Sequence, residues 1–496
     1  MGCLGAAGKA GAGGGAGGGG GAGGAAAKGT GAGAGIDRPN VIIIFTDDQG
    51  YQDVGCFGSP KIRTPHLDGM ADEGMRLTDF YVAAPVCTPS RAALLTGCYP
   101  RRVGLERGVL FPDSKTGLNP DEITLAEVLK GRGYATACIG KWHLGYQPSL
   151  RPLRQGFDRY LGVPYSNDMW LAPDMTFAAD AKLGSGLTAE ALRAGSKDRN
   201  KVPLLSDDEV IEYPVDQTAL TGRYTDEAVR FIGEHKGGPF FIYLAHSMPH
   251  IPLAASAGFK GKSPRGLYGD VIEEMDASVG RILAALKDAG IDGRTLVFFT
   301  SDNGPWLTQG ARGGCALPLR GGKGTTYDGG LREPTICRWP GKVPAGAVCR
   351  EVATSMDLMP TLARLAGGSA PADRVIDGKD IWPLLAGRPG ATSPHEAFFY
   401  YSMSGRLSAV RSGRWKLHVR QSEDYVQPKK PPPGTEVPPW KEELYDLEAD
   451  IGETENVLDG HADVVARLKG LLAAHDAEIA RNRRPVGRVP GEAKAG

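Results

Sequence analysis

Four unbroken apolar runs constrain the fold of this chain more than any other feature. The first is Val41 to Phe45, and similar runs begin at Tyr134, Pro239 and Arg294. Continuous β-branched and aromatic runs of this kind are typical of strands that are buried on both faces of a parallel sheet. Helical patterns such as TLAEVLKGRG and GDVIEEMDASVGRILAALKDAG lie between them. The alternation predicts an α/β domain in which helices sandwich a mixed, mostly parallel sheet.

The pattern changes near residue 390. Short strand-like pieces follow, AFFYY, LSAVRSGRWKLHVR and ELYDLE, and the last helical pattern is DVVARLKGLLAAHDAEIARN. They predict a small antiparallel sheet with a helix over residues 391–485, after a larger domain over residues 36–390. The first 35 residues are nearly all Gly and Ala, and we expect them, like the tail 486–496, to be disordered.

Composition excludes several classes of partner. The chain of 496 residues has 57 basic and 57 acidic side chains, so its net charge predicts neither nucleic acid nor an anionic membrane as a partner. No window approaches the roughly 20 apolar residues of a membrane span. The eight cysteines include no C-x-x-C pair, which argues against a zinc knuckle or a disulfide scaffold. The first residues also lack the Leu-rich core of a secretory signal.

Polar residues follow each of the four apolar runs. They are Asp47 and Asp48 after the first run, Lys141 and His143 after the second, His246 and His250 after the third, and Asp302 and Asn303 after the fourth. Ligands of open parallel sheets bind outside the carboxyl ends of the strands. The sequence therefore predicts that these side chains converge on one crevice.

Four of these residues suit a hard cation. Asp47, Asp48, Asp302 and Asn303 offer oxygen ligands, which favour Ca²⁺ or Mg²⁺ over zinc. A single Asp pair after a strand is more often a turn or a helix cap. Two such ends in one sheet crowd three carboxylates together, and a divalent cation relieves their repulsion.

The stretch PVCTPSRAALLTG places Cys87 just before a short helix pattern, with Thr88, Pro89 and Ser90 as its cap and first turn. Helix N–H groups favour negative charge, so this position predicts a lowered thiol pKa and a reactive group. The alternative is a small buried hydrophobe.

Cations accompany this group, and together they predict an anionic substrate. They are Arg91, Lys141, His143, His250 and Lys323. Trp142 alternates to the opposite face from its neighbours and is expected to pack in the core. Residues 168–222, rich in Gly, Ala and charge, are expected to form loops that wall the pocket.

The motifs CTPSRAALLTG, GKWHLG, SDNG and GKGTTYDGGLREP, with LGVPYSNDMW and ELYDLEADIGE in support, carry a family resemblance. From Pro39 to about Val457 the chain resembles the type I sulfatases, in the branch of arylsulfatase A and N-acetylgalactosamine-6-sulfatase. The resemblance implies an alkaline-phosphatase-like fold and a sulfuric ester hydrolase. It also implies that a formylglycine-generating enzyme oxidises Cys87 to formylglycine.

The resemblance further implies the roles of the site residues. Asp47, Asp48, Cys87, Asp302 and Asn303 would bind Ca²⁺, with Mg²⁺ as the alternative. The sulfate ester of a small molecule, sugar or lipid would lie against Ser166, Lys141, His250 and Lys323, and Arg91 would contact the formylglycine diol. Asp302 would help one diol hydroxyl attack sulfur, Lys323 or His250 would protonate the leaving group, and His143 would take the second diol proton.

The chain departs from this pattern in places. Asn167 stands where close relatives carry histidine beside the serine, and His246 is expected to be structural. The cysteine pattern of the lysosomal relatives is largely absent. The compartment stays open, with an exported or periplasmic location favoured.

Three other functions compete with the sulfatase hypothesis. One is a phosphodiesterase or phosphonate hydrolase of the same superfamily. A second is a sulfated-glycan binding protein in which Cys87 stays unmodified. The third is a cysteine hydrolase that uses Cys87, His143 and Asn303, which leaves the clustered acids unexplained.

Overall fold

The computed structural model describes residues 38–423 and 439–489. The segment 1–35 that we expect to be disordered lies outside the described residues. Residues 424–438 and residues 490–496 of the tail also lie outside them.

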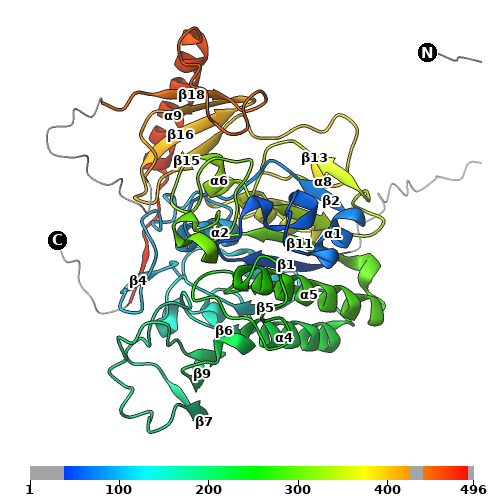
Figure 1. Ribbon diagram of the computed structural model, residues 1–496, viewed down its shortest axis with the longest axis vertical. Coiled ribbons are helices and arrows are strands. Elements are labelled where there is room, and N and C mark those ends of the chain that lie inside the picture. Colours follow the sequence, from blue (N-terminus) through cyan, green and yellow to red (C-terminus); the bar gives the residue numbers. More distant parts are fainter. Residues whose placement is uncertain (1–37, 424–438, 490–496) are drawn as a thin grey trace, which may run out of the picture. The chain divides into compact units, whose positions relative to one another are not determined.

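The described chain is built on a sheet of eleven strands in the order β13-β2-β12-β11-β1-β10-β5-β6-β8-β9-β7 (Figure 1). Their bounds are β1 (Asn40–Thr46), β2 (Met75–Leu77), β5 (Ala135–Gly140), β6 (Arg159–Gly162), β7 (Phe177–Leu183), β8 (Leu204–Ser206), β9 (Glu209–Tyr213), β10 (Phe240–Ala245), β11 (Thr295–Ser301), β12 (Thr335–Arg338) and β13 (Ala347–Cys349). The four predicted runs are the neighbours β11, β1, β10 and β5, which are parallel to one another. The predicted mixed, mostly parallel sheet is confirmed.

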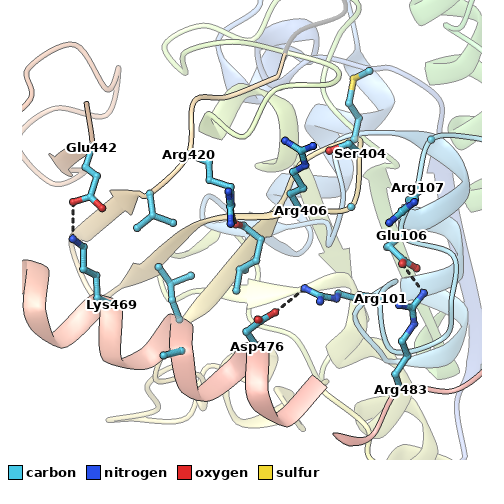
Figure 2. Close-up of a pocket in the computed structure, with 17 residues that line it drawn as sticks. Arg101, Glu106, Arg107, Ser404, Arg406, Arg420, Glu442, Lys469, Asp476 and Arg483 are labelled. Atoms are coloured by element: carbon cyan, nitrogen blue, oxygen red, sulfur yellow. Dashed lines mark hydrogen bonds and ion pairs between the residues drawn. The ribbon is translucent and has the colours of Figure 1, made fainter. Parts of the chain in front are cut away.

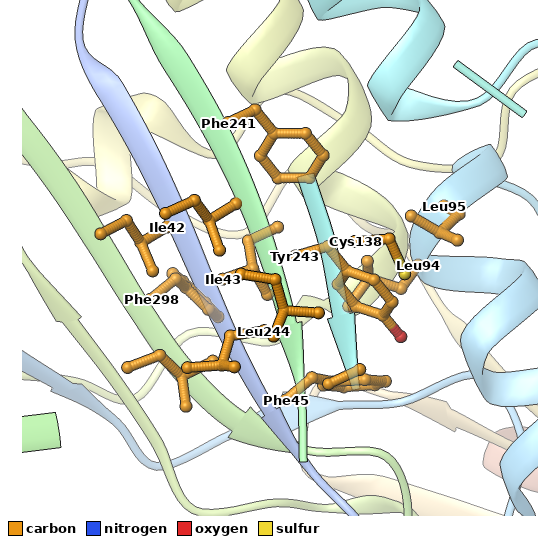
Figure 3. Close-up of a cluster of buried hydrophobic side chains, with 14 of the residues drawn as sticks. Ile42, Ile43, Phe45, Leu94, Leu95, Cys138, Phe241, Tyr243, Leu244 and Phe298 are labelled. Carbon is orange, nitrogen blue, oxygen red and sulfur yellow. The ribbon is translucent and has the colours of Figure 1, made fainter. Parts of the chain in front are cut away.

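Helices cover both faces of this sheet. On one side α4 (Leu220–His235) packs on β10 and β5 and contacts α5 (Leu267–Asp288), which contacts α1 (Pro65–Asp72). On the other side α2 (Cys87–Thr96) contacts α3 (Leu125–Lys130) and α7 (Leu358–Leu365). Phe241 and Tyr243 of β10 point towards Leu94 and Leu95 of α2, whereas Leu244 points to the opposite face (Figure 3). Because β1 and β10 are buried on both faces, apolar and polar residues do not alternate along them.

A second sheet of four antiparallel strands follows α8 (Trp382–Leu385). It contains β15 (Phe398–Tyr401), β16 (Leu407–Ser412), β17 (Trp415–His418) and β18 (Glu443–Asp446), and α9 (Ala462–Arg481) packs on it. Val410, Leu417, Leu444 and Leu468 form the core between sheet and helix. The predicted antiparallel sheet with its helix is confirmed.

Two expectations about irregular segments are wrong. Residues 168–222 contain β7, β8 and β9, which extend the large sheet beyond β6 and are not only loops. The tail does not lose order at residue 486, because β19 (Gly487–Arg488) pairs with β4 (Thr116–Gly117). Val486 packs against the main core at that point, and this contact holds the chain beside β4.

No helix in residues 38–423 or 439–489 has the length and apolar character that a membrane crossing needs.

Candidate active site

The turns that leave the central strands set the geometry of the site. A Cβ atom at Gly140, the last residue of β5, would overlap the carbonyl of Ala245, and a Cβ atom at Gly304 would overlap the carbonyl of Gly329. Asp48 and His143 have left-handed φ values of 65° and 59°, which residues other than glycine rarely adopt. The backbone therefore bends sharply at the carboxyl ends of the strands and brings their polar residues together.

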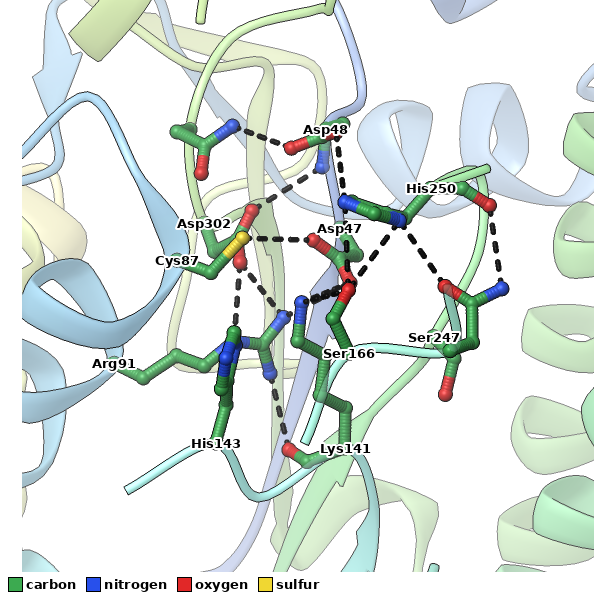
Figure 4. Close-up of polar contacts among 12 residues, drawn as sticks. Asp47, Asp48, Cys87, Arg91, Lys141, His143, Ser166, Ser247, His250 and Asp302 are labelled. Atoms are coloured by element: carbon green, nitrogen blue, oxygen red, sulfur yellow. Dashed lines mark hydrogen bonds and ion pairs between the residues drawn. The ribbon is translucent and has the colours of Figure 1, made fainter. Parts of the chain in front are cut away.

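Cys87 lies within this group, as Figure 4 shows. It is the first residue of α2, after the N-cap residue Val86, so the helix begins two residues earlier than predicted from a Thr88 cap, and Cys87 itself occupies its first turn. Its Sγ atom lies 3.3 Å from Asp47 Oδ1 and 3.8 Å from Lys323 Nζ. The Thr88 hydroxyl donates to the carbonyl of His143 at 2.9 Å and fixes the start of the helix beside the second strand end.

The prediction of a lowered Cys87 pKa is wrong. Burial raises the pKa of the thiol well above its usual value, and the negative charges of Asp302 and Asp47 raise it further. These effects outweigh the helix N-terminus, Lys141 and Lys323. A raised pKa disfavours the thiolate and so weighs against the cysteine hydrolase alternative.

Asp47 and Asp302 are held by two buried cations. Lys141 Nζ lies 2.6 Å from Asp47 Oδ2, and Arg91 Nη2 lies 2.7 Å from Asp302 Oδ2. Burial alone would raise the pKa of Asp47, but Lys141, His250 and Arg91 hold it well below its usual value. Burial and the charge of Asp47 raise the pKa of Asp302 to about 6. The two carboxylates thus repel one another across a shared site.

Asp48 connects the remaining predicted residues. Lys323 Nζ lies 2.7 Å from its Oδ2 atom, and Asn303 Nδ2 donates to its Oδ1 atom at 2.7 Å. His250 Nε2 lies 3.7 Å from Oδ2. The glycine-rich segment and three strand ends therefore meet at one carboxylate.

The donor set fits a hard divalent cation. Ligand atoms of Asp47, Asp48, Cys87 and His250 all lie within 4.8 Å of one another and are buried. Asn303 Oδ1 is also buried and has no hydrogen-bond partner among the described residues. Carboxylate and amide oxygens are the ligands that Ca²⁺ and Mg²⁺ prefer. His250 belongs to this group as well, although the sequence analysis placed it with the substrate.

His250 is held by the neighbouring Ile251 and by the segment that contains Ser166 and Asn167. Its Nδ1 atom lies 2.6 Å from the carbonyl of Ile251 and 3.1 Å from Asn167 Oδ1, and Ser166 Oγ lies 3.4 Å from both ring nitrogens. Ser166 also accepts from Lys141 Nζ at 3.3 Å. Gln217 Oε1 accepts from Asn167 Nδ2 at 3.0 Å, a partner that no local pattern in the sequence indicates.

The predicted histidines differ in their surroundings. His143 Nε2 lies 2.8 Å from the carbonyl of Leu110, and Nδ1 is buried with no partner among the described residues. Burial and the charge of Lys141 hold the pKa of His143 well below its usual value. His246 lies against Tyr224 and makes no hydrogen bond to a described residue. Burial lowers its pKa to about 4.

Comparison with known proteins identifies the family of this chain. The model of the Sulfatase family matches residues 39–369, and that of the C-terminal region of aryl-sulfatase matches residues 393–490. The chain belongs to the sulfatase family. Arylsulfatase A from Bos taurus is 42% identical over 468 residues, 90% of each chain. N-acetylgalactosamine-6-sulfatase from Sus scrofa is 40% identical over 412 residues, 79% of this chain and 74% of that protein.

Solved structures share the fold, among them that of PsFucS1 sulfatase from Pseudoalteromonas sp., with a TM-score of 0.76 and 28% identity over 91% of this chain and 92% of that one. The structure of Ps i-CgsB in complex with k-i-k-neocarrahexaose aligns with a TM-score of 0.73 and 29% identity, over 90% of this chain and 94% of that one. This sulfatase is thus a sulfuric ester hydrolase with the alkaline-phosphatase-like architecture.

Sequence reasoning missed one buried acid of the sulfatase site. Glu333 is fully buried, and neither carboxyl oxygen has a hydrogen-bond partner among the described residues. Burial raises its pKa well above the usual value, and the charges of Asp302 and Asp48 raise it further. A protonated carboxyl group therefore lies behind the acids of the site. The glycine-rich motif ends in Arg-Glu-Pro, but no local pattern indicates that its glutamate turns inward.

Proposed function

We propose that this sulfatase hydrolyses sulfate monoesters at residue 87 after oxidation of Cys87 to formylglycine, with Ca²⁺ bound beside it and Mg²⁺ as the alternative. One observation carries the proposal: Cys87 Sγ lies 3.3 Å from Asp47 and 3.8 Å from Lys323, at the meeting point of buried acids and cations. A maturation enzyme that generates formylglycine is the partner that this chemistry requires.

Asp47, Asp48, Asp302, Asn303 and residue 87 would hold the cation. A hydrated aldehyde supplies a hydroxyl nucleophile and a second hydroxyl for product release, and a divalent cation lowers the pKa of such a hydroxyl. The other contributions come from side chains of this chain.

Lys141, Lys323 and Ser166 carry the donors that suit the sulfate oxygens. Lys141 pairs with Asp47, and Lys323 pairs with Asp48. Two fixed positive charges in a buried site stabilise the charge that grows on sulfate oxygens as the ester bond breaks. Arg91 keeps Asp302 in place through two N–H groups, at 3.0 and 2.7 Å.

Proton transfers follow from the hydrogen bonds of the bases. The Leu110 carbonyl accepts from Nε2 of His143, so Nδ1 of the neutral ring carries a lone pair that can take a proton. His250 donates from Nδ1 to the Ile251 carbonyl, so its Nε2 atom is an acceptor in the neutral ring. Lys323 is left as the better donor to the departing alcohol.

The comparisons best support a sulfate ester whose alcohol part is a carbohydrate. A solved structure that aligns over 90% of this chain, that of Ps i-CgsB, is a complex with k-i-k-neocarrahexaose. We therefore propose a sulfated sugar as the substrate class, although sulfated lipids and aryl sulfates share the reacting group.

Release of inorganic sulfate from 4-nitrophenyl sulfate tests this proposal when it is compared with hydrolysis of bis(4-nitrophenyl) phosphate. We expect kcat/KM for the sulfate to exceed that for the phosphodiester by about 100-fold, a preference of about 2.7 kcal/mol in transition-state binding. The protein is produced together with a formylglycine-generating enzyme, and Cys87→Ala is the inactive control. Faster turnover of the phosphodiester would assign the site to the phosphodiesterase alternative.

A further inference from the structure

A cavity of about 990 Å³ lies between the C-terminal sheet and the segment that follows α2. Its walls come from residues 101–108, from the turn between β15 and β16, from the end of β17 and from α9 (Figure 2). None of the residues in the donor group around Cys87 lines it.

The cavity is strongly basic. Six basic and three acidic side chains line it, which leaves a surplus of three positive charges. The basic residues are Arg101, Arg107, Arg406, Arg420, Lys469 and Arg483. This surplus is local, because the whole chain has equal numbers of basic and acidic residues. A cavity of this charge attracts anions.

Several of these cations are available to a ligand. Arg101, Lys469 and Arg483 pair with Asp476, Glu442 and Glu106, and all three basic side chains are partly exposed. The Arg101–Asp476 and Lys469–Glu442 pairs are exposed, and pairs of this kind contribute little and exchange partners readily, whereas Glu106 is buried. Arg107 and Arg406 are exposed, and neither pairs with a carboxylate in the described part of the chain. Guanidinium groups bind tetrahedral oxyanions through paired N–H donors.

The cavity also offers apolar surface. Leu407, Val419 and Leu472 contribute to its lining. Arg406 and Arg420 are shared with an adjoining cavity, which Trp440 lines. An indole ring beside guanidinium groups suits a ligand that has both an apolar face and negative charge, such as a sulfated sugar ring.

A second cavity adjoins the basic cavity at the start of α2. It measures about 390 Å³ and shares Glu106, Arg107 and Arg483 with the basic cavity. Its lining also includes Thr88, the neighbour of Cys87, and Leu110, whose carbonyl contacts His143. A chain-like ligand can therefore extend from the Cys87 helix towards the arginines.

We propose that the basic cavity is a binding subsite for a second sulfate group of a sulfated oligosaccharide, several sugar units away from the ester at residue 87. The subsite rests on the proposed function for its choice of ligand. It selects esters on sulfated chains over small sulfate esters, because only a chain places a second sulfate group near Arg107 and Arg406.

Binding of chemically sulfated maltohexaose to the Cys87→Ala protein tests the subsite without turnover. We expect the added substitutions Arg107→Ala and Arg406→Ala together to weaken binding about tenfold or more, as for the loss of charge-assisted hydrogen bonds. Arg388→Ala is the matched control, because Arg388 is exposed and lines neither cavity. Unsulfated maltohexaose should bind far more weakly than the sulfated form. Equal affinity of the double variant and the control would overturn the proposal.

Further binding measurements distinguish a sulfated chain from other anionic ligands. Inorganic sulfate at matched ionic strength should bind far more weakly than the sulfated chain, and equal affinity would make this a free-anion site. Single-stranded DNA that binds as tightly would make it a nonspecific polyanion surface. The double variant with Cys87 intact should keep its kcat/KM on 4-nitrophenyl sulfate. If the unsubstituted enzyme fails to hydrolyse that ester, the proposed function fails, whereas the binding measurements still decide the subsite.

Discussion

At the scale of single residues, Cys87 and Lys323 are central to the proposed chemistry. Burial, followed by the charges of Asp302 and Asp47, raises the pKa of the Cys87 thiol well above its usual value, which disfavours thiolate chemistry at this residue. Lys323 lies beside it, above the ring of Trp306 at 4.5 Å from the ring centre. This contact places the ammonium group between an aromatic face and Asp48.

Replacing Cys87 by serine should lower sulfatase turnover about 100-fold or more, because a serine hydroxyl lacks the second hydroxyl that releases sulfate. Thermal unfolding should change little. Cys138→Ser is the matched control, since Cys138 is also fully buried but lies in the apolar core of the sheet. That control should lose stability and keep kcat in the folded protein. Undiminished turnover of Cys87→Ser would refute the aldehyde mechanism.

Lys323→Ala should reduce kcat most for esters with poor leaving groups, because these need the proton that Lys323 donates. The measurement is kcat for a series of aryl sulfates whose phenol pKa values differ, with the exposed Lys342→Ala as the control. A steeper dependence on phenol pKa in the variant is expected. Losses of the same size for good and poor leaving groups would remove Lys323 from this role.

At the scale of elements, a buried ionic cluster ties the C-terminal sheet to the glycine-rich segment. Lys416 on β17 lies 2.8 Å from Asp328 and 2.7 Å from Glu453, and all three are buried. Asp328 begins α6 (Asp328–Leu331), five residues after Lys323, and its N–H group donates to Glu453 at 2.7 Å. The second sheet therefore anchors the segment that presents Lys323.

Lys416→Met should lower the free energy of unfolding by about 3–5 kcal/mol, because it removes the cation that Asp328 and Glu453 share in the buried cluster. Turnover in the folded protein should fall as well, since the anchor of the Lys323 segment is lost. Lys130→Met removes an exposed pair with Asp158 and should cost less than about 1 kcal/mol. Denaturant unfolding and kcat measure both effects. A loss as small as that of Lys130→Met would show that the cluster does not anchor the segment.

Asp53 joins three segments in the same way. Its carboxylate accepts from the Tyr268 hydroxyl and from the N–H groups of Gly50 and Cys315. Burial raises its pKa from 3.8 to about 6 despite these bonds. The native state thus favours the protonated form, and the stability that this group contributes is present below pH 3.8 and is lost as the pH rises through about 6.

A rise in the Asp53 pKa from 3.8 to about 6 corresponds to about 3 kcal/mol of stability that is lost as the pH rises. Asp53→Asn should remove this pH-dependent loss of stability. The variant carries a constant cost from its altered hydrogen bonds, so the pH slope is the diagnostic quantity. Relative to the unsubstituted protein, its free energy of unfolding should improve between about pH 4 and pH 7. Asp72→Asn, at an exposed position, should leave the two curves parallel. Parallel curves for Asp53→Asn would contradict the raised pKa.

At the scale of the whole molecule, a bound cation should stabilise the fold, because it relieves repulsion among three carboxylates from two distant parts of the chain. Ca²⁺ at a hundred times its Kd should add about 2.7 kcal/mol to the free energy of unfolding. Chelation should lower Tm and abolish sulfate release. Asp48→Asn should lose most of the Ca²⁺-dependent rise in Tm, and a full rise in that variant would place the cation elsewhere.

The sequence alone predicts those parts of the structure that local patterns determine. The four central strands and the acids at their ends are of this kind, because each apolar run and its polar terminus are adjacent in the chain. Asn167 with Gln217, Lys416 with Asp328, and the inward turn of Glu333 depend on segments that only the tertiary fold brings together. The pKa of Cys87 was mispredicted for the same reason, since the helix start is local and its acidic surroundings are not.

Mass spectrometry of the peptide that contains residue 87 tests the central claim most directly. In active enzyme produced together with a formylglycine-generating enzyme, we predict a peptide lighter by about 18 Da than its cysteine form, and the lighter fraction should rise in proportion to kcat. Full sulfatase activity in a preparation whose residue 87 is entirely free thiol would contradict the account.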